Sequence, residues 1–244
     1  MALILNIETA TPVCSVALSR NGELVQIREN REGRSHASLL SYFIEDILKK
    51  QDIGVSDLDA VSISKGPGSY TGLRIGVSTA KGLCYGADLP LIALSTLQAL
   101  SQGLLCHLEE NPDVVQPDDQ TLLVPMLDAR RMEVYSALLD RDLRFMREVQ
   151  PEIIDASSYR GWLDRYTLVF FGSGAAKTSE VVRHPNAIFI EDIVPSARHM
   201  RELSLQQYRQ GSFEDVAYFE PFYLKEFMAT KPRKNIIGPG KKWR

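Results

Sequence analysis

The stretch SKGPGSYTGLRIGVSTAKG, from Ser64 to Gly82, carries five glycines in nineteen residues and marks the clearest strand-to-helix transition in the chain. It follows the apolar run DAVSIS and opens into a segment with helical spacing. A glycine-rich turn at such a junction is a common cradle for phosphate. The glycines are spaced G-x-G-x-x-x-G, which matches neither the dinucleotide loop nor the P-loop, and no lysine stands at the Walker position. Two interpretations therefore remain open: a tight structural turn, or an anion site with Arg74 beside it.

The helix after this turn carries small residues at every fourth position. They are Gly72, Gly76, Ala80 and Cys84. Each glycine costs about 1 kcal/mol relative to alanine in a helix, so the strip indicates that another element approaches closely. That element is either the protein's own sheet or a helix of another subunit. In the second case the apolar side of the helix packs inward through Leu73, Val77 and Leu83.

The composition is that of an ordinary globular protein. The chain has 244 residues, of which 44% are hydrophobic and 24% charged, so it accommodates one large domain or two small ones. The start, MALILNIETATPV, has no basic region and is expected to be a buried strand rather than a signal peptide, and no apolar run approaches the ~20 residues of a membrane span. Three cysteines without CxxC spacing argue against a disulfide framework and a zinc site. We expect a cytoplasmic protein without a membrane association.

Charge is unevenly distributed along the chain. The net charge is −3, but the tail 231–244 holds six Lys and Arg residues and no acid, which leaves −9 on the remainder. Such a tail is either a solvated end or an arm for nucleic acid or an acidic partner.

Two α/β lobes with mixed sheets are predicted from the order of the elements. In the first, the runs ALILNIE, CSVALSR and ELVQIREN indicate antiparallel strands, the last two joined at Asn21-Gly22. A helix over SHASLLSYFIEDILKKQ follows, with Ser35 as its expected N-cap, then a strand, the helix after the glycine loop, another strand and another helix. The order of strands and helices recurs more loosely after residue 120.

The polar segment NPDVVQPDDQ separates the two lobes. We assign residues 1–110 to the first lobe, 111–230 to the second and 231–244 to the basic tail. The helix 196–211, with Ser196 as its expected cap, belongs to the second lobe in sequence and is a candidate to pack on the first.

Residues with catalytic chemistry are scarce. The four histidines include no pair at i, i+3 or i+4, so no metal-binding helix is predicted. In GSYTG the serine stands one place too early for a nucleophile elbow, and Ser69 is expected to cap the coming helix instead. A second glycine turn, FFGSGAAK, with Gly172, Gly174 and Lys177, follows a strong strand and is either a structural turn or a nucleotide contact.

Four stretches in this order resemble the TsaB (YeaZ) family over nearly the whole chain, to about residue 226. They are ILNIETATPVCSVAL, SKGPGSYTGLRIGVSTAKGL, MLDARRMEVYSA and EPFYLKE. The resemblance implies an actin-like, sugar-kinase-like (ASKHA) fold with duplicated lobes. It also implies an accessory role in the threonylcarbamoyl modification of the adenosine beside the anticodon of ANN-decoding tRNAs. The implied partners are the TsaD-like transferase subunit, a TsaE-like ATPase and, indirectly, tRNA, for which the basic tail is a candidate contact. Alone, such proteins tend to form homodimers.

Departures from the catalytic relative support a non-catalytic role. That relative binds a metal through a histidine pair on the helix after the first lobe's last strand, where this chain has Ser95 and Ala99. The turn IETATP lacks the glycine of the phosphate-binding turn of the wider fold, and Glu8 stands where the family usually has aspartate, so we assign Glu8 no catalytic role. The alternative is an ATP-binding kinase, ATPase or peptidase of the same fold.

The site residues follow from the resemblance and from the strip. No catalytic residue, metal or required cofactor is assigned. The partner interface is predicted to comprise His36, Leu39, Leu40, Phe43, Tyr70, Gly72, Arg74, Gly76, Thr79, Ala80 and Leu83. Weak binding of a nucleotide or anion is assigned to Gly68, Arg74, Gly172 and Gly174.

Overall fold

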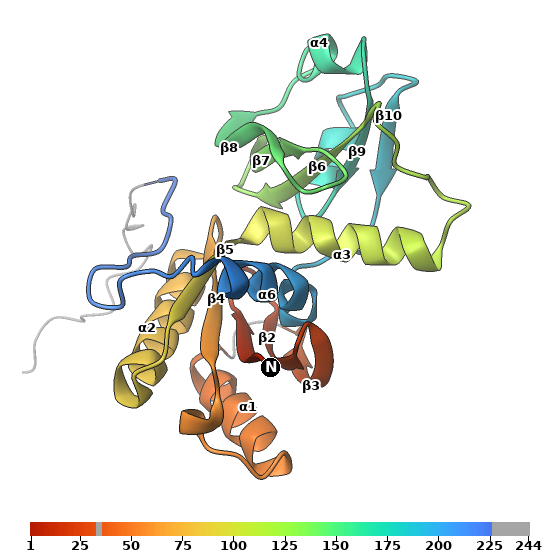
Figure 1. Ribbon diagram of the computed structural model, residues 1–244. Helices are drawn as coiled ribbons and strands as arrows, with labels where there is room; N and C mark the ends of the chain where they lie inside the picture. Colours follow the sequence, from red (N-terminus) through yellow and green to blue (C-terminus); the bar gives the residue numbers. More distant parts are fainter. Residues whose placement is uncertain (33–35, 226–244) are drawn as a thin grey trace, which may run out of the picture.

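Two five-stranded sheets form the two lobes of the computed structural model, which describes residues 1–32 and 36–225 (Figure 1). The first sheet has the order β3-β2-β1-β4-β5, and the second, β10-β9-β6-β7-β8, repeats that order from its other end. In each sheet three strands are antiparallel, and two more run parallel to the central strand. The predicted two-lobe α/β fold with a duplicated pattern is thus confirmed. The strands are β1 Leu3–Glu8, β2 Cys14–Arg20, β3 Glu23–Asn30, β4 Ala60–Gly66, β5 Leu91–Ser95, β6 Thr121–Asp128, β7 Glu133–Leu139, β8 Phe145–Ile153, β9 Thr167–Phe171 and β10 Ala187–Ile190.

Helices cover both faces of the first sheet. The helices are α1 His36–Lys50, α2 Tyr70–Ala87, α3 Thr96–Glu110, α4 Arg160–Leu163, α5 Ala175–Ser179 and α6 Arg201–Gln210, with short 3-10 turns η1 Val55–Asp57 and η2 Ala197–Met200. On one face, the apolar stripe of α1 packs with α2 and the sheet into a core that includes Ile47, Ile63 and Val77. On the other face, η2 and α6 pack through Met200 and Leu205.

The hairpin between β2 and β3 forms at Asn21-Gly22, as predicted. Both residues have positive φ, 53° and 85°, which suits the right-handed twist of a two-residue turn. The predicted N-cap Ser35 lies outside the described residues, as does the basic tail 231–244.

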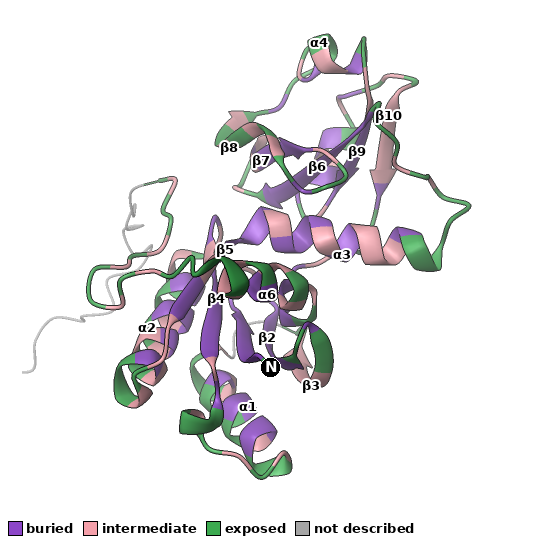
Figure 2. Ribbon diagram, in the orientation of Figure 1, coloured by how far each residue is buried: buried purple, intermediate pink, exposed green. Residues whose placement is uncertain are grey.

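Helix α3 lies between the two lobes and contacts both (Figure 1). Leu97, Leu100 and Leu104 enter the core of the second lobe, whereas Ala99 packs with the first-lobe sheet. Most residues of this helix are buried or half-buried (Figure 2). The second lobe has a further core on its other face, beneath α4 and α5. Helix α6, although it follows the second lobe in sequence, lies against the first-lobe sheet, since Leu205 shares a core with Ile4 and Ile92. Among the described residues no helix is long and apolar enough to cross a membrane.

Candidate functional site

A cavity of about 560 Å³ lies where the two lobes face each other. Apart from Ser173, four segments that are far apart in sequence line it: residues 10–12, residues 67–71, residues 127–135 in part, and residues 222–225. These segments fall within the four stretches on which the family resemblance rests. The most distinctive parts of the sequence therefore meet at one place in the fold.

The glycine loop is built to lie directly on the first turn of the chain. Ser69 N–H donates to Ala10 O at 2.6 Å, and Ser69 Oγ caps α2 by accepting from Gly72 N–H at 3.3 Å, as predicted. A Cβ on Gly72 would stand 2.1 Å from Thr9 O, so only glycine permits this approach. This geometry supports the interpretation of the glycine loop as a tight structural turn.

The strip of small residues on α2 faces the protein's own sheet, which corrects part of the predicted interface. A Cβ on Gly76 would come within 2.1 Å of Thr9 Oγ1 and 3.0 Å of Ile63 Cδ1, and Ala80 is wholly buried. The small-residue spacing does indicate a close approach, but the approaching residues are Thr9, directly after β1, and Ile63 on β4. Gly72, Gly76 and Ala80 are therefore unsuited to touch another subunit.

Two residues predicted at the interface on α1 are also core residues. Leu40 and Phe43 are buried against the first-lobe sheet, because the apolar stripe of the amphipathic helix turns inward. The other predicted interface residues keep part of their surface. His36, Leu39, Tyr70, Thr79 and Leu83 are half-buried, and Arg74 is exposed.

The outer face of α2 carries a second row of small residues, which the sequence analysis did not assign to the interface. Ser78, Gly82 and Gly86 are exposed at i, i+4 and i+8, and no described atom lies within 4 Å of a Cβ placed on either glycine. Tyr85 on the same helix is 87% exposed, and Tyr42 on the adjacent α1 is 58% exposed. The two strips share one spacing, so spacing alone does not say which of them faces the sheet.

Glu8, at the end of β1, is completely buried. Burial raises the pKa of Glu8 to about 7, and the Ala10 N–H, 2.6 Å from Oε1, and the neighbouring Ser64 hydroxyl offset only part of this effect. Within the described chain Glu8 Oε2 has no hydrogen-bond partner of good geometry. The carboxyl group lies behind the β1–β2 turn and is not among the groups that line the cavity.

Asp128 ends β6, the strand that corresponds to β1, and it does line the cavity. Lys177 Nζ lies 2.5 Å from Asp128 Oδ1, and the Arg130 N–H donates to the same oxygen at 2.9 Å. Partial burial favours the protonated form, but these contacts outweigh it and hold the pKa of Asp128 below its usual value. This carboxylate is therefore engaged by its own lobe.

The residues predicted to hold an anion are only partly brought together. Gly68 lines the cavity, but Arg74, Gly172 and Gly174 do not. Arg74 lies 5.5 Å from the centroid of the Tyr70 ring instead.

The second glycine turn contributes Ser173, which lines the cavity and whose Oγ accepts from Asp128 N–H at 3.0 Å. Arg130, with a φ of 77°, and Lys225 also line it and were missed as site residues. A signal for both was available, because MLDARRMEVYSA and EPFYLKE belong to the distinctive stretches.

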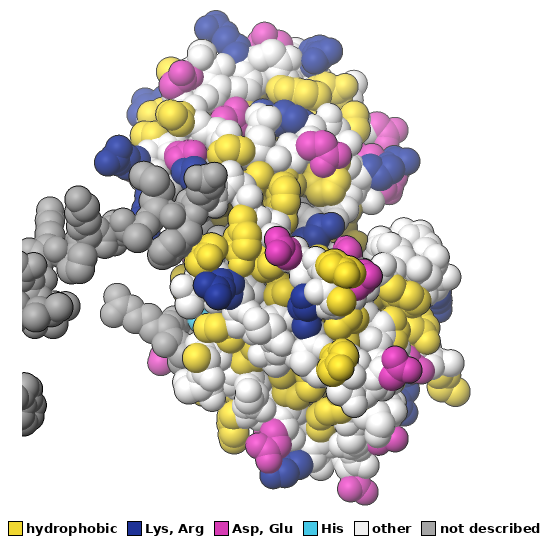
Figure 3. All heavy atoms as spheres, turned by 90° about the vertical axis from the view of Figure 1, so that its left-hand side faces the viewer, with side chains coloured by type: hydrophobic (Ala, Val, Ile, Leu, Met, Phe, Trp, Pro, Cys, Tyr) yellow, Lys and Arg dark blue, Asp and Glu magenta, His cyan; other side chains and the backbone are white. Residues whose placement is uncertain are grey.

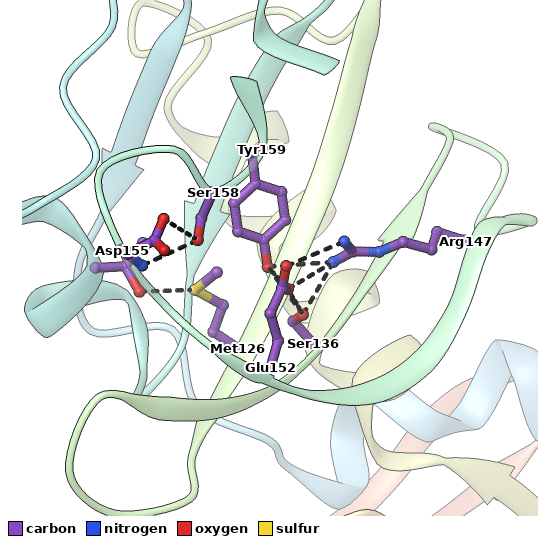
Figure 4. Close-up of polar contacts among 8 residues, drawn as sticks. Met126, Ser136, Arg147, Glu152, Asp155, Ser158 and Tyr159 are labelled. Atoms are coloured by element: carbon purple, nitrogen blue, oxygen red, sulfur yellow. Dashed lines mark hydrogen bonds and ion pairs between the residues drawn. The ribbon is translucent and has the colours of Figure 1, made fainter. Parts of the chain in front are cut away.

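A separate polar cluster in the second lobe has a structural purpose (Figure 4). Tyr159 Oη donates to Glu152 Oε2 at 2.5 Å, and Arg147 donates to the same carboxylate at 3.0 Å and lies over the Tyr159 ring at 4.9 Å. Ser136 joins them from β7. The cluster fastens the loop after β8 to the sheet and does not line the cavity. In the described part of the chain, no group of three or more His, Cys, Asp or Glu residues is placed to hold a metal ion.

The fold and this cavity define a two-lobed α/β protein in which both lobes share one sheet order. Residues 27–158 match the family model TsaD, described as tRNA N6-adenosine threonylcarbamoyltransferase. The chain is 30% identical over 237 residues to the tRNA threonylcarbamoyladenosine biosynthesis protein TsaB of Escherichia coli K12, covering 93% of this chain and 96% of that protein. The Haemophilus influenzae protein of the same name is 29% identical over 238 residues, covering 93% and 95%. The structure of YeaZ from Pseudomonas aeruginosa superimposes with a TM-score of 0.75 at 24% identity, covering 92% of this chain and all of that one, which shows a shared fold.

The chain therefore belongs to the TsaB family, within the wider family that the TsaD model describes. The role that follows is in the biosynthesis of threonylcarbamoyladenosine in tRNA. The resemblance drawn from the four sequence stretches is confirmed.

Proposed function

We propose that this protein is a non-catalytic subunit that binds and activates a TsaD-like transferase, and that the outer faces of α1 and α2 form the contact. The observation that carries the proposal is the exposed row Ser78, Gly82 and Gly86, together with the exposed rings of Tyr85 on the same helix and Tyr42 on α1. A row without side chains lets a partner helix approach closely, and exposed aromatic rings are typical anchors of protein interfaces.

The chemistry of the strand ends supports an accessory role. Glu8 is sealed behind the first turn, and Asp128 is held by Lys177. Glu8 does not line the cavity, and Asp128, which does, is already paired with Lys177, which argues against the alternative of an ATP-dependent enzyme. We propose further that a TsaE-like ATPase completes the complex in the cytoplasm, and that two copies pair through the same face when the transferase is absent.

The interface is tested by Gly82→Leu with Gly161→Leu as the matched control. Both glycines have open space at the Cβ position, but Gly161 lies on α4 in the second lobe. We expect Gly82→Leu to weaken binding to the TsaD-like subunit at least tenfold in calorimetry, because a leucine cannot fit a tight helix contact. The control should bind like the wild type, and both variants should melt at the wild-type temperature or above.

Two results would contradict the proposal. Wild-type affinity in Gly82→Leu and also in Tyr85→Ala would remove this surface as the interface. Transfer of the threonylcarbamoyl group to tRNA by the isolated chain, supplied with the threonylcarbamoyl adenylate, would remove the non-catalytic assignment.

A further inference from the structure

We infer that residues 212–225, here called the strap, latch the two lobes together across the cavity and that Lys225 is the end that releases. The strap leaves α6, passes beside α2 and β4, and turns toward the second lobe (Figure 1). This inference concerns lobe closure and does not depend on the proposed function.

The first part of the strap is fastened to the first lobe by its own backbone. Glu214 N–H donates to Leu91 O at 2.9 Å, so the strap pairs with the start of β5. Lys81 on α2 donates to Ala217 O at 3.1 Å and to Phe219 O at 3.0 Å. These bonds hold two carbonyl groups that an irregular segment would otherwise leave to water.

The middle of the strap is fitted closely to the glycine loop. Phe222 N–H donates to Lys65 O at 2.7 Å. Gly66, with a φ of 116°, lies so near that a Cβ there would stand 2.7 Å from Phe222 O. The Tyr223 ring lies 4.8 Å from the Tyr70 ring, centroid to centroid, at the first residue of α2. The loop is therefore shaped to receive the strap as well as the first turn of the chain.

The far end crosses to the second lobe. Lys225 Nζ pairs with Glu133 Oε2 on β7 and lies 5.8 Å from the centroid of the Tyr135 ring. Residues 222–225 thereby form part of the wall of the cavity. Hydrophobic side chains gather in the middle of this side of the molecule, between the lobes (Figure 3).

The two ends of the strap differ in strength, which is why we assign release to Lys225. Backbone hydrogen bonds and a ring contact hold the first-lobe end. The second-lobe end depends on an ion pair whose side chains are 40% and 25% exposed, and a contact of this kind is weak and screened by salt. Release of Lys225 leaves the strap on the first lobe and frees the second lobe to move away, which opens the cavity.

The latch is tested by charge reversal and charge exchange in the isolated chain. Lys225→Glu and Glu133→Lys each put two like charges together, whereas the double variant restores an attractive pair. Spin labels at Ser41 on α1 and Glu148 on β8, both exposed, report the distance between lobes by pulsed electron resonance in a Cys106→Ser background. We expect each single variant to raise the population with the longer distance several-fold, and the double variant to return it to the wild-type level.

Added salt and truncation of the strap provide two further tests of the latch. High salt should shift the wild type toward the longer distance and leave a chain ending at residue 212 unchanged. Truncation after Lys225 should leave the wild-type distribution in place. Identical distributions in the wild type and both single variants, or a double variant that stays open, would overturn the latch. Melting curves of all variants verify that the lobes themselves remain folded.

Discussion

The two lobes repeat one sheet order, yet they use the corresponding positions differently. In the first lobe the loop after β4 launches an 18-residue helix that is pressed onto the end of β1, and the acid there is buried with no countercharge among the described residues. In the second lobe the loop after β9 launches a five-residue helix, and the acid at the end of β6 is exposed and paired with Lys177. The duplicated fold therefore fixes where these groups lie, whereas the surrounding side chains decide what each of them does.

The two lobes differ most in the close packing of α2 on the end of β1. We expect Gly76→Leu to abolish this packing. The new side chain would begin 2.1 Å from Thr9 Oγ1, which is itself buried and bonded to Gly72 O at 2.9 Å. We expect a loss of more than about 5 kcal/mol, comparable to the whole stability of a domain. Circular dichroism melts should show no cooperative transition for the soluble fraction.

Gly82→Leu, on the outer face of the same helix, is the matched control. Its Cβ meets open space, and leucine is a better helix former than glycine by up to about 1 kcal/mol. Its melting temperature should equal or exceed that of the wild type. A cooperative melt of Gly76→Leu near the wild-type temperature would show that the strip does not face the sheet.

The next prediction concerns Glu8, the buried acid at the end of β1 in the first lobe. With the pKa raised from 4.5 to about 7 in the folded state, the native protein retains a proton between these values that the unfolded chain has lost. Stability should therefore fall as pH rises from about 4.5 to 7 and level off above. Glu8→Gln removes this loss, and Nε2 of the new amide can donate to the Ser64 hydroxyl. We expect Glu8→Gln to be more stable than the wild type by up to about 3 kcal/mol at pH 8 and equal to it near pH 4.

Urea denaturation of both proteins across this pH range measures the effect. Glu45→Gln, on the exposed face of α1, is the control that changes the same charge without a buried group. A constant difference between Glu8→Gln and the wild type at all pH values would show that the pKa of Glu8 is the same in the folded and unfolded states.

Much of this comparison was predictable from the sequence, and the limits have physical causes. The antiparallel start, the hairpin at Asn21-Gly22 and the cap at Ser69 follow from local rules of backbone conformation and hydrogen bonding. Local rules do not say which partner fills a small-residue strip, because Thr9, just after β1, and Ile63, on β4, come from distant parts of the sheet region. For the same reason the cavity was not foreseen, although the segments that line it were the distinctive ones. Lys225 and Arg130 become neighbours of the same cavity only once both lobes are folded.

The last prediction concerns Asp128, the acid at the end of β6 in the second lobe, for which the pH dependence of stability has the opposite sign. Its pKa is lowered in the folded state, so the pair with Lys177 contributes stability above the unfolded pKa that is lost as pH falls below it. Asp128→Asn should therefore lose stability at pH 7 and approach the wild type below about pH 3. We expect less than about 1 kcal/mol, because the Asp128 side chain is half exposed and Lys177 keeps its bonds to Arg131 O and Glu133 O, at 2.7 Å and 2.6 Å. The same urea series measures the two acids together, and the comparison holds only if the Glu8→Gln and Asp128→Asn differences run in opposite directions with pH. A gain in stability for Asp128→Asn at pH 7 would mean that the ionised Asp128 destabilises the fold, as the ionised Glu8 does. The two strand ends would then not differ in the way their surroundings imply.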